Sequence, residues 1–262
     1  MNTEKNKQEN KKALKILIPV SIAAGIIGGV IGGVSTTNKA QDLALVFKEW
    51  LEEFFILIGP WSVIVVSIAG LIVSFYIYKS AVKEYKENMP EGSNQELEED
   101  LFKDVDHKIS IGTLVNSVTM IVSFMLYAIV IAYLDVYIMS GAIILVAVSL
   151  LAFIITCLGQ AKLQQMLVDF VKIMYPGKDG SVYDFRFSQK WEESCDELEK
   201  LLIYKAAYKA YKTTSGACCI ALVITILLSF FFHYGPLPAM VVGCIWLTSI
   251  VSYCLEAMKL DK

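Results

Sequence analysis

The sequence has few charged residues, and the places where charge is missing are informative. Only 19% of its 262 residues are charged, whereas 56% are hydrophobic; a soluble domain carries about a quarter charged residues. Asp, Glu, Lys and Arg are absent from six long runs: 16–34, 54–78, 109–134, 137–158, 215–234 and 237–255. This segregation excludes an ordinary soluble domain and indicates an integral membrane protein.

The sequence also lacks the motifs that would indicate catalysis, a cofactor or a metal. It contains no H-E-x-x-H, G-x-S-x-G or G-x-x-x-x-G-K-[ST] pattern, and its six cysteines form no C-x-x-C pair. An acidic run over 96–106, next to His107, lacks the spacing of a calcium loop, so a solvated acidic face is the preferred interpretation. We therefore expect no catalytic residues, no cofactor and no bound metal.

Each of the six runs is long enough to cross the hydrocarbon core of a bilayer. In lipid, only a helix satisfies the backbone of a single segment. We therefore predict an all-α polytopic membrane protein with six transmembrane helices, arranged as three hairpins with cytoplasmic helical extensions. The first run follows a basic start, as a signal peptide would, but its apolar core is long and no good cleavage site follows, so we expect a retained helix.

Lysine and arginine fix the expected orientation. Of the 23 such residues, 21 fall in the two tails and in the connections 79–108 and 159–214, which the positive-inside rule places in the cytoplasm. We expect a cell-membrane protein with both termini cytoplasmic. The predicted segments are an N-tail (1–15), a first hairpin with an outer amphipathic link (16–78), an acidic loop (79–108), a second hairpin (109–158), a helical loop (159–214), a third hairpin (215–255) and a C-tail (256–262).

Small and polar residues inside the predicted spans mark expected helix contacts. Five glycines of the first span share one helix face, and the third span carries an amide; these packing residues are Gly25, Gly28, Gly29, Gly32, Gly33 and Asn116. Glycine lets a second helix approach closely, and an amide can hydrogen-bond across helices. We expect the glycine face to pack against the protein's own helices, and a homo-oligomer is the alternative.

Two further residues in the apolar runs have a structural interpretation. Proline is tolerated in the first turn of a helix, so Pro60 is interpreted as the start of the second span, with a kink as the alternative. An ionisable group within the membrane often marks transport. His233, however, falls at the outer boundary beside Tyr234, and we expect an interfacial residue.

The 159–214 connection has two helical patterns separated by a Pro-Gly and Asp-Gly turn. The first pattern continues the fourth span inward, with an apolar stripe at Leu163, Met166, Leu167, Phe170 and Ile173. The second begins with Ser188 as N-cap and runs without interruption towards the fifth span. We predict that these two helices pack against each other as an antiparallel pair.

Aromatic and basic residues follow the second pattern as two stripes. Both have helical spacing. The aromatic stripe comprises Tyr204, Tyr208 and Tyr211, with Trp191 earlier in the same pattern, and the basic stripe comprises Lys205, Lys209 and Lys212. Tyrosine favours the headgroup level, and lysine is attracted to an anionic leaflet. We interpret the stripes as a juxtamembrane anchor or a partner-binding face. Acidic residues in the preceding turns argue against nucleic acid.

The segment from Tyr175 to Lys212 resembles a family of uncharacterised multi-spanning membrane proteins of Gram-positive bacteria, known only as a domain of unknown function. The resemblance extends over most of the chain. It is strongest at Trp191, Ser194, Cys195, Asp196, Glu199, Lys200, Tyr204, Tyr208, Lys209 and Tyr211. It implies a bacterial cell-membrane protein and supplies no activity or catalytic residues.

Three functions are compatible with these features. The first is a non-enzymatic sensor or scaffold whose cytoplasmic helices bind a protein partner, since catalytic groups are missing beside a patterned helix. The second is a permease-like subunit of a transporter, for which a polar cavity around Asn116 would be the sign. An intramembrane enzyme ranks last. The expected partners are the lipid bilayer, a second copy of the chain or a cytoplasmic protein, and not nucleic acid.

Overall fold

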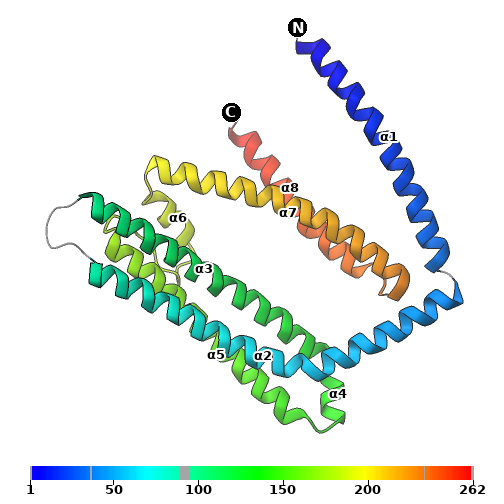
Figure 1. Cartoon of the computed structure of the whole chain (residues 1–262), viewed down its shortest axis with the longest axis horizontal. Coiled ribbons are helices and arrows are strands. Elements are labelled where there is room, and N and C mark those ends of the chain that lie inside the picture. Colours follow the sequence, from blue (N-terminus) through cyan, green and yellow to red (C-terminus); the bar gives the residue numbers. More distant parts are fainter. Residues whose placement is uncertain (1, 36, 89–94, 233, 261–262) are drawn as a thin grey trace. The chain divides into compact units, whose positions relative to one another are not determined.

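The chain folds into helices, as its apolar runs require. The computed structural model describes residues 2–35, 37–88, 95–232 and 234–260 and contains no strand in these residues; His233 lies outside them. Eight helices occur in the described residues (Figure 1): α1 (Asn2–Ser35), α2 (Asn38–Asn88), α3 (Gln95–Ala132), α4 (Leu134–Met139), α5 (Ile143–Met174), α6 (Phe187–Glu193), α7 (Glu197–Phe232) and α8 (Leu237–Leu260). The predicted all-α class is confirmed.

Six of these helices, α1, α2, α3, α5, α7 and α8, are long and apolar enough to cross a membrane. Each exceeds the roughly 20 residues that a span requires, and the prediction of six helices able to cross a membrane is confirmed. The chain divides into two compact units, which we name the central unit (Glu52–Ile203) and the terminal unit (Met1–Leu51 with Tyr204–Lys262). The boundaries fall inside α2 and α7, so each of these helices belongs to both units.

At one end of the central unit, most of the apolar stripe of α5 is buried, whereas its last residue, Ile173, is exposed. Leu167 and Phe170 of α5 lie in one cluster with Ala81 of α2 and Val105 of α3. Phe170 also meets the ring of Tyr85 edge-on at 5.5 Å. We predicted that this stripe packs against the helix of residues 191–211, and this was wrong for its main partner. Helices α2 and α3 extend beyond their apolar runs at this end and cover the stripe instead.

At the other end of the central unit, a second cluster forms around Tyr137, with Val63, Val130 and Val146. Tyr137 belongs to the short helix α4, which ends before Gly141, a residue with φ of 73°. This left-handed conformation favours glycine and stops a helix. The fourth span therefore starts at Ile143, not at Tyr137 as we predicted.

Pro60 lies inside α2, so the predicted helix start at this residue was wrong. The alternative, a kink at Pro60, stays a prediction. Proline has no N–H, so the carbonyl four residues earlier loses its helical hydrogen bond. The Tyr137 hydroxyl donates to this carbonyl, that of Ile56, at 2.7 Å. A Cβ at Gly59 would come within 3.0 Å of the same hydroxyl. Gly59 and Pro60 together thus create an acceptor that α4 satisfies.

In the terminal unit, α7 and α8 form a hairpin. The rings of Tyr211 and Tyr253 stack at 4.7 Å, and at the turn the Ser229 hydroxyl donates to the carbonyl of Gly235 at 3.1 Å. The predicted outer link is helical, but it forms the first part of α2 and not a separate element. Its Phe47 ring lies 6.2 Å from the ring of Phe232.

Candidate functional site

The candidate site lies in the residues that join α5 to α7, which we name the linker layer (residues 175–203). We predicted one continuous helix here, starting at Ser188, and this was wrong. Ser188 is the second residue of α6, whose N-cap is Arg186 without a side-chain cap, and α6 ends at Glu193. Helix α7 begins at Glu197, after three intervening residues.

A reciprocal pair of hydrogen bonds explains the start of α7. The Asp196 carboxylate accepts from the Glu199 amide at 2.7 Å, and the Glu199 carboxylate accepts from the Asp196 amide at 3.0 Å. This is a capping box, which satisfies amides that the first turn of a helix leaves unpaired. An acidic residue followed three positions later by glutamate is visible in the sequence, so this signal could have located the helix start.

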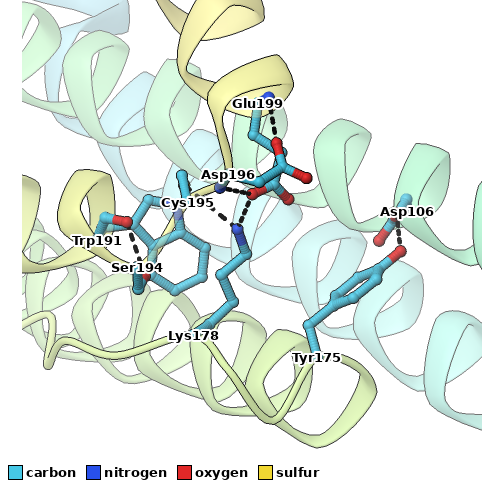
Figure 2. A network of polar contacts seen from close by, with 8 residues as sticks. All are labelled: Asp106, Tyr175, Lys178, Trp191, Ser194, Cys195, Asp196 and Glu199. Atoms are coloured by element: carbon cyan, nitrogen blue, oxygen red, sulfur yellow. Dashed lines mark hydrogen bonds and ion pairs between the residues drawn. The ribbon is translucent and has the colours of Figure 1, made fainter.

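Lys178 ties the loop after α5 to this cap (Figure 2). Its ammonium donates to the Glu199 carboxylate and, at 3.3 Å, to the Cys195 sulfur. It also lies 5.9 Å from the ring centroid of Trp191, and its side chain is only 9% exposed. Burial lowers the pKa of Lys178, but the contacts with Glu199 and Cys195 outweigh burial and raise it overall. Lys178 is therefore charged at neutral pH.

A second polar contact joins the linker layer to α3. The Tyr175 hydroxyl donates to the Asp106 carboxylate at 2.6 Å (Figure 2). Burial, followed by this hydrogen bond, raises the pKa of Tyr175, so its phenol stays neutral. Across the described ranges Asp106 forms no ion pair with a lysine, arginine or histidine.

These side chains line a cavity of about 330 Å³ whose walls are both polar and apolar. Its lining residues are Asp106, Val171, Tyr175, Lys178, Trp191, Cys195, Glu199, Leu202 and Ile203. A neighbouring cavity of about 400 Å³ between α3, α5 and α6 shares Val171 and Trp191 with it and includes Ser110, Thr113 and Gln164. Both volumes fall in the range of small-molecule sites. No three His, Cys, Asp or Glu side chains converge to hold a metal anywhere in the described residues.

Before α6, an ordered turn exposes two aromatic side chains. Tyr183 and Phe185 are both exposed, Phe185 fully so. Between them, Asp184 accepts from the Arg186 amide at 2.9 Å and pairs with Lys190 at 2.7 Å. The Lys190 ammonium and the Arg186 amide lower the pKa of Asp184, so the pair persists at neutral pH. The contacts of Asp184 thus fix the conformation of the turn and leave both aromatic rings exposed on the surface.

Of the predicted anchor or partner residues, only Trp191 belongs to the candidate site. Tyr204, Lys205, Tyr208, Lys209, Tyr211 and Lys212 lie on α7 in the terminal unit. Tyr204 and Tyr208 are exposed, and the Lys212 ammonium lies 5.9 Å from the ring centroid of Tyr208. The stripes follow the predicted helical faces, and their role as an anchor stays a prediction.

The predicted packing residues fall into two different environments. A Cβ added at any of the five α1 glycines would meet no described atom within 4 Å; they are Gly25, Gly28, Gly29, Gly32 and Gly33. The choice between own-chain and homo-oligomer packing therefore stays a prediction. Asn116, by contrast, is buried and joins α3 to α5, since its amide nitrogen donates to the Gln160 carbonyl at 3.2 Å and to the Gln164 side chain at 3.0 Å.

Other polar side chains are also buried in the central unit. The amide of Gln160, the side-chain oxygen of Asn116 and the hydroxyls of Ser67, Ser74 and Ser123 have no hydrogen-bond partner within the part of the chain that the structure describes. A buried polar group without a partner is costly, above all in a membrane. The sequence identified Asn116 as a packing residue but not Gln160, which lies two residues beyond the predicted fourth span.

Comparison with known proteins agrees with this architecture but adds no activity. No curated protein and no solved structure matches the chain. A family described as "Protein of unknown function (DUF3169)" matches residues 8–257. Because this match covers nearly the whole chain, helices and linker layer together, the protein belongs to this uncharacterised family.

Proposed function

We propose that this protein is a non-enzymatic sensor or scaffold of the bacterial cell membrane, and that its linker layer lies in the cytoplasm and binds a protein partner. The distribution of lysine and arginine supports this orientation, with both termini on the same side as the linker layer. Catalytic motifs are absent from the sequence, and this supports a role in binding.

The observation that carries the proposal is the turn that exposes Tyr183 and Phe185. Exposed aromatic side chains are typical of the residues that dominate binding energy in protein interfaces. Here Asp184 fixes the turn from both sides, through Arg186 and Lys190. A preformed turn loses little conformational freedom when a partner binds.

The start of α7 could transmit partner binding at the linker layer to a candidate membrane span. The capping pair Asp196 and Glu199, together with Lys178, fixes the first turn of a helix that continues for 36 residues and includes a candidate span. A partner that shifts the linker layer would therefore act on a helix that belongs to both units.

A photo-crosslinking amino acid at position 185, in the full-length protein in native membranes, tests the proposal. We expect a protein adduct of one defined mass from position 185 and none from position 87. The native Glu87 is also exposed and lies in the other predicted cytoplasmic connection. Replacing Tyr183 with serine should reduce the yield of this adduct. Adducts with lipid alone would show that the turn is a membrane anchor and would refute the partner proposal.

A permease-like transporter subunit is the second candidate, and the unpaired polar groups of Ser67, Ser74, Ser123 and Gln160 favour it. The buried position of Asn116 favours the first candidate, because this side chain is enclosed and bonded to α5. Reaction of Ser123→Cys with a water-soluble maleimide separates the two. We expect no labelling beyond that of the parent protein; rapid labelling would indicate a water-filled path and favour transport.

A further inference from the structure

The charges around the linker-layer cavity do not balance. Two carboxylates, Asp106 and Glu199, and one ammonium, Lys178, line it. Lys178 is bound to Glu199 and Cys195, whereas Asp106 accepts a hydrogen bond from the neutral Tyr175. The cavity thus carries one net negative charge, and it is located at Asp106.

The remaining walls suit an organic body rather than a hydrated ion. Val171, Leu202 and Ile203 supply aliphatic surface, and Trp191 supplies an indole ring. Tryptophan is the best of the aromatic side chains at attracting a cation to its ring face, and the Lys178 ammonium already lies 5.9 Å from its centroid. Aromatic and aliphatic walls with a few polar groups are typical of a small-molecule site.

We propose that this cavity binds a small organic monocation, with its ammonium group at Asp106 and its apolar body against Trp191 and Leu202. An anion is disfavoured because the cation in the lining is already paired and two carboxylates would repel it. A divalent metal is disfavoured because the described residues bring no three suitable ligands together. This proposal goes beyond the partner-binding function and does not depend on it.

Isothermal titration of the full-length protein in detergent with benzyltrimethylammonium tests the proposal, and benzenesulfonate serves as the anionic control. We expect saturable one-to-one binding of the cation up to about 10 mM and no binding of the anion. Asp106→Asn should weaken binding about tenfold or more, because the amide keeps an acceptor for Tyr175 but removes the charge. Trp191→Leu should also weaken it, because the apolar body loses the aromatic surface against which it packs.

Asp104→Asn is the matched control, since Asp104 is exposed on the same helix and does not line the cavity. This variant should bind benzyltrimethylammonium with the same affinity as the parent protein. Asp106→Glu should retain binding, which guards against a folding defect in the amide variant. Absence of saturable binding, or equal affinities of Asp106→Asn and the parent, would overturn the proposal. Failure of cation binding would leave the adduct at position 185 unaffected, so the two proposals fail separately.

Discussion

The central and terminal units are built from helices of similar apolar character but differ in how the chain buries them. In α2, α3 and α5, between 22% and 28% of the most apolar stretch of the helix is buried, whereas in α1, α7 and α8 none of the corresponding stretch is buried. Among lipid tails, apolar surface alone does not drive helices together. Hydropathy therefore identifies a candidate span but does not show whether that helix packs against other helices of the same chain.

Close contacts explain the burial in the central unit. A Cβ at Gly70 of α2 would lie 2.9 Å from Thr119 Cβ of α3, and a Cβ at Gly159 of α5 would lie 2.6 Å from a methyl carbon of Leu71. Both are too short for real carbon contacts, so a side chain at Gly70 would displace Thr119 together with its Cβ, whereas the flexible end of Leu71 can shift to admit one at Gly159. The glycines of α1 have the denser sequence pattern, yet the structure places the close crossings elsewhere. Glycine spacing by itself therefore does not identify which helices pack against each other in the central unit.

The largest expected effect comes from enlarging a glycine. Gly70→Leu forces the α2–α3 crossing apart, and overpacking of this kind costs about 3 kcal/mol in the free energy of unfolding. Gly29→Leu is the matched change on α1, where an added Cβ meets no described atom within 4 Å, and it should cost below about 0.5 kcal/mol. Unfolding in detergent by added SDS measures both.

The same pair of variants sharpens the prediction for the glycine face. If this face joins two copies of the chain, Gly29→Leu should reduce the oligomer seen by light scattering while leaving the unfolding free energy nearly unchanged. Equal destabilisation by Gly29→Leu and Gly70→Leu would contradict the contrast between the two units.

The next effect concerns the hydroxyl that compensates for Pro60. Tyr137→Phe leaves the Ile56 carbonyl without its partner, at a cost of about 1–2 kcal/mol. Tyr211→Phe, in the terminal unit, should cost almost nothing because the stack with Tyr253 needs only the ring. The same SDS titration applies, and identical values for the two variants would show that the Tyr137 hydrogen bond contributes no stability.

A smaller effect is expected at the start of α7. Lys178→Met removes the cation of Glu199, whose side chain is 40% exposed, so water screens part of the loss and the cost is about 1 kcal/mol. Hydrogen exchange at residues 198–202 should accelerate, since the capping carboxylate is less firmly held. Lys162→Met is the control, because Lys162 is exposed and donates to Gln165 on its own helix. No change in exchange for Lys178→Met would show that the cap is independent of the loop.

The smallest effect on unfolding is expected from replacing Lys205, Lys209 and Lys212 together with glutamine. All three are exposed, so the unfolding free energy should change by less than about 0.5 kcal/mol. An anchor would lose about 1 kcal/mol of attraction to anionic lipid per lysine. We therefore expect less anionic lipid to copurify with the variant. Unchanged lipid content would argue against anchoring and favour a partner face.

Two predictions from the sequence were wrong because hydrogen bonds interrupt a helical pattern. Helical periodicity continues from Ser188 to Lys212, but the helix is interrupted at Ser194–Asp196. There the Asp196 and Glu199 carboxylates accept hydrogen bonds from each other's backbone amides, and Lys178 binds the Glu199 carboxylate. Tyr137 reads as the first residue of a span, yet it is held in α4 by a carbonyl that Pro60 leaves unpaired. The start of α7 therefore had a local signal in the capping box, whereas the position of Tyr137 depends on a residue far away in the sequence.

Composition and charge segregation by themselves determined that the protein is all-α and has six helices able to cross a membrane, because the backbone has no other way to be satisfied in lipid. Tertiary structure decided which of those helices pack, where α7 begins, and that Asp106, Tyr175, Lys178 and Trp191 line one cavity. These residues come from three separate segments of the chain. Their proximity depends on how α3, α5 and α6 cross, and the period of a single helix carries no information about its neighbours.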